Sequence, residues 1–85
     1  MYKLEIYSSD QCNYCQMAKR ILTHRGLVYE EYNIAHNPVL FDEMHQRANQ
    51  RSVPQIFLND EHIGGFDNLM DSINEGRFES LIDSA

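Results

Sequence analysis

The two cysteines of the sequence, Cys12 and Cys15, stand three positions apart, a spacing at which two thiols can form a reversible disulfide. Random placement of two cysteines would give this spacing in only about 2% of arrangements, so chance explains it poorly. If the segment begins a helix, side chains three apart lie on one face at about 5–6 Å, and a small adjustment closes the bond. The pair therefore predicts redox chemistry.

The elements around the cysteines predict that the two thiols differ. Residues 2–7 alternate apolar and polar side chains and predict a strand, and residues 13–25 predict a helix. The apolar face of that helix is formed by Tyr14, Ala18, Ile21 and Leu22. Cys12 would lie at the helix start, where free N–H groups and the macrodipole stabilise a thiolate, while Cys15 lies one turn deeper. We expect Cys12 to be the nucleophile and Cys15 the resolving thiol.

A metal site is the main alternative for the cysteine pair. A structural zinc ion needs four ligands, and one C-x-x-C segment supplies two. The four histidines are scattered over different predicted elements: His24, His36, His45 and His62. Because they form no paired motif, we expect no metal site built from this chain alone.

The rest of the chain alternates in the same way. Residues 27–34 predict a strand, and Asn37-Pro38 predicts the start of a helix with a cap followed by proline. Residues 55–58 and 61–63 predict two strands around an Asn59-Asp60 turn. A third helix ends at Gly76, and a final short turn follows it. The order βαβ-α-ββ-α predicts an α/β protein with a mixed four-stranded sheet flanked by helices.

Length and charge narrow the function classes. The 85 residues predict one domain, residues 1–85, and the net charge of −6 argues against attraction to nucleic acid or anionic membranes. The whole excess lies in residues 60–85, where seven acidic groups face only Arg77, and it predicts a solvated acidic face on a C-terminal helix. We find no signal peptide or membrane span and expect a cytoplasmic protein.

Three segments together resemble the glutaredoxin family. Cys12-Asn13-Tyr14-Cys15 is similar to its Cys-Pro-Tyr-Cys, and Arg51-Ser52-Val53-Pro54 is similar to its Thr-Val-Pro segment. Gly64-Gly65-Phe66-Asp67-Asn68 resembles its Gly-Gly-x-Asp-Asp. The resemblance covers nearly the whole chain and implies a thioredoxin-like fold. The absence of tryptophan argues against thioredoxin itself.

The resemblance also implies a glutathione site. The family has a cis peptide at the position of Val53-Pro54, which would present the Val53 backbone to an extended peptide. The N–H groups of Phe66 and Asp67 would hold the γ-glutamyl carboxylate. Asp67 would pair with the ligand ammonium, act as a plain helix N-cap, or do both.

The resemblance implies two further contacts with glutathione, and the sequence differs from the family pattern at two positions. Arg51 would hold the glycine carboxylate, or it is a solvated loop cation. Tyr14 would pack on the ligand, or only on its own helix face. Asn13 replaces the usual proline between the thiols, and Ser9 stands where many members carry lysine.

The implied activity is glutathione-dependent thiol-disulfide oxidoreduction, with glutathione as reductant. Its substrates would be protein disulfides and protein–glutathione mixed disulfides. The protein would act as a monomer in electron transport and in the redox homeostasis of the cell. The alternative is a dimer that binds a [2Fe–2S] cluster through Cys12 and glutathione, as some members without that proline do. A third interpretation is a glutaredoxin-like hydrogen donor that thioredoxin reductase reduces. It ranks lower, because this sequence lacks the aromatic-rich C-terminal signature usual in such proteins.

Overall fold

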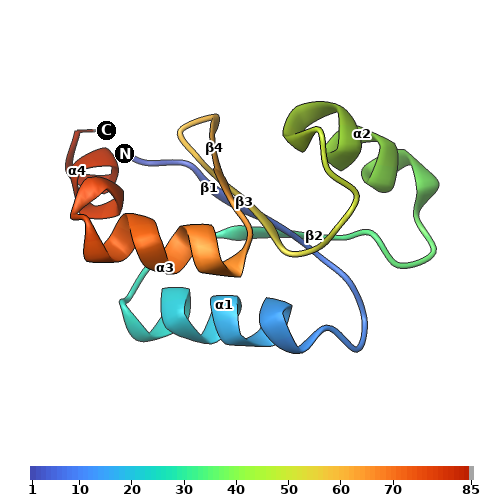
Figure 1. Ribbon diagram of the computed structural model, residues 1–85, viewed down its shortest axis with the longest axis horizontal. Coiled ribbons are helices and arrows are strands. Elements are labelled where there is room, and N and C mark those ends of the chain that lie inside the picture. Colours follow the sequence, from blue (N-terminus) through green and yellow to red (C-terminus); the bar gives the residue numbers. More distant parts are fainter. Residues whose placement is uncertain (85) are drawn as a thin grey trace.

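Four strands form one mixed sheet in the computed structural model, which describes residues 1–84 (Figure 1). They are β1 (Leu4–Ser8), β2 (Glu30–Asn33), β3 (Gln55–Leu58) and β4 (Glu61–Gly64), in the order β2-β1-β3-β4. β1 runs parallel to β2 and antiparallel to β3, and β3 runs antiparallel to β4. The predicted α/β class with a mixed sheet and a thioredoxin-like arrangement is confirmed.

Helices cover both faces of this sheet. α1 (Asn13–His24) and α3 (Phe66–Asn74) lie side by side on one face, while α2 (Pro38–Ala48) lies on the other (Figure 1). α2 begins as predicted, because the Asn37 side chain accepts a hydrogen bond from the Leu40 N–H at 3.1 Å. The predicted final short turn is a seven-residue helix, α4 (Arg77–Asp83), because Phe78 inserts into the core and anchors it.

The sheet separates two apolar cores. The core under α1 and α3 contains nine buried residues: Leu4, Ile6, Ala18, Leu22, Ile56, Leu58, Ile63, Leu69 and Phe78. The core under α2 contains Tyr7, Met44, Ala48 and Phe57. β1 is buried along its whole length, so its alternating pattern separates two cores rather than a core from solvent.

The charged residue of β1, Glu5, is buried with a partner. Only 5% of Glu5 is exposed, and Arg47 of α2 donates to its two carboxylate oxygens at 3.1 and 3.3 Å. Arg47 also donates to the Tyr7 hydroxyl at 2.9 Å and lies 4.0 Å from the Phe57 ring centroid. The Tyr32 hydroxyl donates to Glu5 at 3.0 Å. This network places a buried ion pair in the α2 core.

The second predicted strand is shorter than expected. The prediction was residues 27–34, but β2 covers Glu30–Asn33, and the Ile34 N–H adds one more hydrogen bond, to the Ser8 carbonyl of β1. The Leu27 N–H donates to the Leu22 carbonyl at the end of α1, and the Val28 N–H donates to the Tyr2 hydroxyl. Because these two N–H groups donate outside the sheet, the pairing of β2 with β1 begins only at Glu30.

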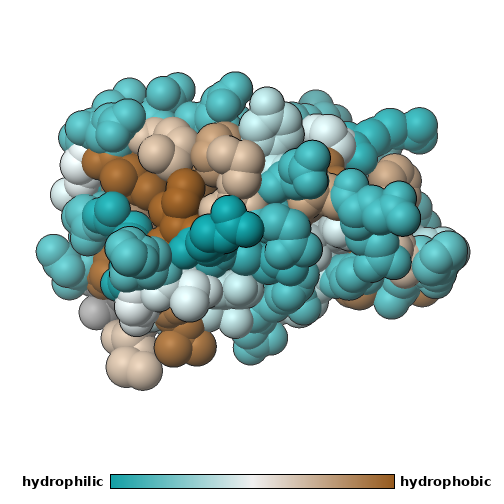
Figure 2. Space-filling model, turned by 90° about the horizontal axis from the view of Figure 1, so that it is seen from below, coloured by the Kyte–Doolittle hydropathy of each residue, from teal (hydrophilic) through white to brown (hydrophobic). Residues whose placement is uncertain are grey.

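The acidic segment that begins at residue 60 is only partly the solvated acidic face that was predicted, because some of its carboxylates form ion pairs. Within it, three acidic groups pair with basic side chains: Asp60 with Lys3, Glu61 with Arg77 and Glu79 with Arg25. Figure 2 views the molecule from the side of α1 and shows a mostly hydrophilic surface with hydrophobic side chains gathered in one half. Within residues 1–84, no helix has both the length and the hydropathy needed to cross a membrane.

Candidate active site

The strand register brings the three sequence motifs to one end of the sheet. Tyr7, near the end of β1, pairs with Gln55, so the cysteine segment that follows β1 lies beside the segment that precedes β3. Gly64, at the end of β4, pairs with Ile56, which places the start of α3 at the same end. The antiparallel β1–β3–β4 arrangement therefore assembles one site from segments far apart in sequence.

The two cysteines differ in placement as predicted. Cys12 is the N-cap of α1 and is half-buried, whereas Cys15 lies inside the first turn and is fully buried. Their sulfur atoms are joined in a disulfide. The Cys15 N–H donates to the Cys12 Sγ at 3.1 Å, and helix N–H groups of this kind stabilise a thiolate. Once the disulfide is reduced, Cys12 is the sulfur that a partner can reach.

The Val53-Pro54 segment forms the wall opposite the cysteines. The peptide bond between the two residues is cis, as the family resemblance implied. The Val53 carbonyl oxygen lies 4.0 Å from the Cys12 Sγ, and Pro54 is buried. The backbone of Val53 therefore borders the reactive sulfur.

A hollow of about 240 Å³ lies along this wall. Its lining residues come from all three motifs and the loop before Pro54: Tyr14, Gln50, Ser52, Val53, Pro54, Gln55, Gly65, Phe66, Asp67 and Asn68. Five of the six residues predicted to contact glutathione therefore line this one hollow. The sixth, Arg51, is exposed and does not line the hollow, although both its neighbours do.

Tyr14 lies at the rim of the hollow, not on the buried helix face. It is 59% exposed, and its ring lies 5.5 Å from that of Phe66. The buried face of α1 is formed by Cys15, Ala18 and Leu22. Placing Tyr14 on that face was wrong, because its position is one step round the helix from Cys15.

The start of α3 offers free backbone donors to the hollow. The first hydrogen bond within the helix runs from the Leu69 N–H to the Gly65 carbonyl, so the N–H groups of Phe66 and Asp67 have no acceptor within α3. Gly65 is the N-cap, so Asp67 is not the plain cap that was one alternative. The Asn68 side chain accepts from the Gly65 N–H at 3.0 Å and fixes this turn.

Gly64 has a steric reason to be glycine. Its φ is +121°, a conformation that L side chains rarely adopt. A Cβ there would lie 2.5 Å from the Asn68 Oδ1, the atom that holds the turn. The Gly64-Gly65 pair therefore lets β4 pass closely under the start of α3.

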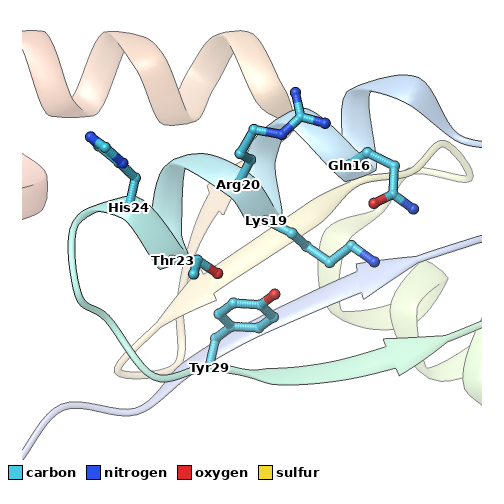
Figure 3. A pocket seen from close by; sticks show the side chains of 6 residues that line it. All are labelled: Gln16, Lys19, Arg20, Thr23, His24 and Tyr29. Atoms are coloured by element: carbon cyan, nitrogen blue, oxygen red, sulfur yellow. The ribbon is translucent and has the colours of Figure 1, made fainter.

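A second hollow lies along α1, and none of its lining residues belongs to the three sequence motifs. It is lined by Gln16, Lys19, Arg20, Thr23, His24 and Tyr29 (Figure 3). Its Lys19 already pairs with Glu31 at 2.8 Å. Burial alone would raise the pKa of Glu31, but hydrogen bonds from Lys19 and Ser8 lower it below its ordinary value. Among residues 1–84, no three His, Cys, Asp or Glu side chains are grouped to hold a metal ion.

Comparison with known proteins decides the family. The Glutaredoxin family model matches residues 4–63, which include the cysteine pair and Val53-Pro54. The chain belongs to the glutaredoxin family. Glutaredoxins are thiol oxidoreductases, and in this one the redox-active pair is Cys12 and Cys15.

Relatives and solved structures agree with this assignment. A glutaredoxin of Neisseria meningitidis is 40% identical over 83 residues, which cover 96% of this glutaredoxin and 98% of the relative. The solution structure of a Brucella melitensis glutaredoxin is 35% identical, with a TM-score of 0.80 over 93% of this chain and 86% of that one. A buckwheat glutaredoxin–glutathione complex has the same fold, with a TM-score of 0.86 at 24% identity, over 98% and 78% of the two chains.

Four polar residues of the hollow were missed as site residues. Gln50 and Gln55 come from the loop and strand flanking Val53-Pro54, while Ser52 and Asn68 were only members of two of the motifs. Gln55 carried a usable signal, because it is a polar residue in a predicted buried strand next to a proline. Gln50 had none, since an exposed glutamine before a loop is ordinary.

Proposed function

We propose that this glutaredoxin is a glutathione-dependent thiol-disulfide oxidoreductase that reduces protein disulfides and protein–glutathione mixed disulfides. The observation that carries the proposal is the hollow beside Cys12. It combines free N–H groups at the start of α3, the Asp67 carboxylate and the Val53 backbone, and the Val53 carbonyl oxygen lies 4.0 Å from the half-buried Cys12 sulfur. Glutathione has the matching groups, namely two carboxylates, one ammonium, a peptide backbone and a thiol.

The binding mode follows from matching these groups. The γ-glutamyl carboxylate would accept hydrogen bonds from the Phe66 and Asp67 N–H groups, and the neighbouring ammonium would pair with the Asp67 carboxylate. The peptide part would lie extended against Val53, which points its sulfur at Cys12. Arg51, beside the hollow, stays the predicted partner of the glycine carboxylate. The buckwheat glutaredoxin was solved as a complex with glutathione, which supports such a site on this fold.

The reaction then proceeds by thiol–disulfide exchange. The Cys12 thiolate attacks the glutathione sulfur of a mixed disulfide, and the substrate protein leaves as a thiolate that takes up a proton. A second glutathione thiolate attacks the sulfur of the Cys12 adduct, releasing oxidised glutathione and the Cys12 thiolate. With a protein disulfide as substrate, the Cys12 thiolate first attacks one of its sulfurs, and the other leaves as a thiolate that takes up a proton. Cys15 then attacks the Cys12 sulfur of this mixed disulfide, which releases the second substrate thiol and forms the disulfide seen here. Two glutathione molecules reduce it again and leave as oxidised glutathione.

The direct test is a coupled reduction assay. A glutathionylated protein is incubated with glutathione, NADPH and glutathione reductase, and NADPH oxidation is followed with and without the glutaredoxin. We expect turnover that depends on both glutathione and the glutaredoxin. Turnover that requires thioredoxin reductase in place of glutathione would contradict the proposal and favour the hydrogen-donor alternative.

Replacing Asp67 with asparagine is expected to raise the KM for glutathionylated substrates about 10-fold with little change in kcat. The variant keeps the shape and the backbone N–H but loses the charge that would pair with the ammonium, and charged hydrogen bonds contribute about 1.5–3 kcal/mol. Asp71, one turn further along the exposed side of α3, is the matched control. Equal KM values for Asp67→Asn and Asp71→Asn would show that the Asp67 carboxylate does not bind glutathione.

The cluster-binding alternative stays a prediction. Each chain offers one accessible sulfur, on Cys12, so a [2Fe–2S] cluster would take its other ligands from glutathione and a second chain. Absorbance and sizing after anaerobic reconstitution with iron, sulfide and glutathione test it. A cytoplasmic location, where glutathione keeps thiols reduced, is likewise proposed from the activity.

A further inference from the structure

Gln55 is a buried amide that ties down one wall of the hollow. It is the first residue of β3, directly after Pro54, and only 1% of it is exposed. Its Nε2 donates to the Ser52 carbonyl at 3.0 Å and to the Gln50 Oε1 at 3.1 Å. Both hydrogens of the amide are therefore used to hold the loop that leads into Val53.

The other end of this amide is held by His62 of β4. The His62 Nε2 lies 2.7 Å from the Gln55 Oε1, and because this oxygen only accepts, Nε2 carries the hydrogen. The imidazole stacks on the Phe57 ring with 4.9 Å between centroids. Burial, and the charge of Arg47, lower the pKa of His62 below its ordinary value and so favour the neutral ring.

The hydrogen bonds of Gln55 link His62 to the loop beside the hollow. If the His62 donor were lost, the Gln55 oxygen would remain buried without its partner, and the amide would be held by its two donor hydrogen bonds alone. A rotation that gives the oxygen a new partner would turn these donors away from Ser52 and Gln50, two of the loop residues that line the hollow. The effect would reach the Val53 backbone, which follows them in the chain and borders Cys12.

We propose that His62 is a positioning residue: through Gln55 it holds the loop of residues 50–53 in the shape that receives glutathione. This rests on the proposed function, since it concerns the same hollow. His62 does not line the hollow, so it acts only through the amide. Its loss should therefore weaken binding of glutathionylated substrates without changing the chemistry at Cys12.

The test is a set of histidine variants in the coupled assay. His62→Phe keeps a ring on Phe57 but has no N–H donor, and we expect it to raise the KM for a glutathionylated peptide about 3- to 10-fold with kcat within about 2-fold. His62→Gln places an amide N–H near the position of Nε2 and should restore most of the KM. The control is His45→Leu, because His45 packs on Phe41 of α2 at 6.2 Å, away from the hollow.

A double variant separates positioning from a general loss of stability. Gln55→Met removes both links, so adding His62→Phe to it should raise the KM no further. Additive effects, an unchanged KM in His62→Phe, or equal KM values for His62→Phe and His62→Gln would each overturn the proposal. Should His62→Phe not fold, His62→Leu replaces it in the same comparison. If the unmutated protein shows no glutathione-dependent turnover, the proposed function fails first, which is a separate result.

Discussion

Cys12→Ser is expected to abolish thiol transfer, whereas Cys15→Ser should keep the removal of glutathione from mixed disulfides and lose the reduction of protein disulfides. A serine hydroxyl cannot form the nucleophile at neutral pH, so the loss for Cys12→Ser should exceed about 100-fold. Cys15 is fully buried and joins the reaction only by attacking a sulfur already on Cys12. The measurement is the coupled assay with a glutathionylated protein and with a protein disulfide.

The same asymmetry predicts the alkylation rates of the reduced protein. Cys12, half-buried at the N-cap with the Cys15 N–H pointing at its sulfur, should react much faster than Cys15 at neutral pH. Mass spectrometry of briefly alkylated protein distinguishes the two sites. Equal rates, or full disulfide reduction by Cys15→Ser, would contradict the assigned roles.

Arg47→Ala is expected to lower the free energy of unfolding by about 3 kcal/mol. The replacement would leave the Glu5 carboxylate buried in the α2 core with only the Tyr32 hydroxyl as a donor, and breaking a buried pair costs about 3–5 kcal/mol. It would also remove the guanidinium from the Phe57 ring. Chemical denaturation monitored by circular dichroism gives the value.

An exposed ion pair provides the control for this prediction. Arg77 pairs with Glu61, and both side chains are close to half exposed, so Arg77→Ala should cost less than about 1 kcal/mol. The double variant Glu5→Leu with Arg47→Leu should recover most of the stability, because no buried charge remains. Similar losses for Arg47→Ala and Arg77→Ala would show that the Glu5–Arg47 pair contributes no more than a surface pair.

The parts of the fold that the sequence predicted well are those with local signals. The cap at Asn37-Pro38 marked the start of α2, and the strands around Asn59-Asp60 were predicted to within a residue. The errors came from tertiary contacts. Val28 favours a strand, but its N–H donates to the Tyr2 hydroxyl. The alternation of residues 2–7 did not indicate that Glu5 is buried, because its partner Arg47 lies on α2.

The site divides in the same way. The spacing of Cys12 and Cys15 predicted their chemistry, and helix position predicted which is exposed. The assembly of Tyr14, Val53 and Asp67 around one hollow was implied only by the family resemblance, because sequence spacing does not show that the end of β1, the start of β3 and the end of β4 meet. The link from His62 to the hollow had no sequence signal, since it depends on the register that places β4 beside Gln55.

The antiparallel pairing of β1 with β3 also ties the site to the order in which the chain folds. Cys12 and Cys15 can meet through local helix formation, which takes microseconds or less. The Val53 wall is 41 residues away from Cys12 and arrives only when the long loop closes and β3 docks, a slow, non-local event. A partly folded chain would therefore hold a working cysteine pair with no wall beside it. The contacts by which the Val53 wall selects a partner would therefore be acquired later than the cysteine pair itself.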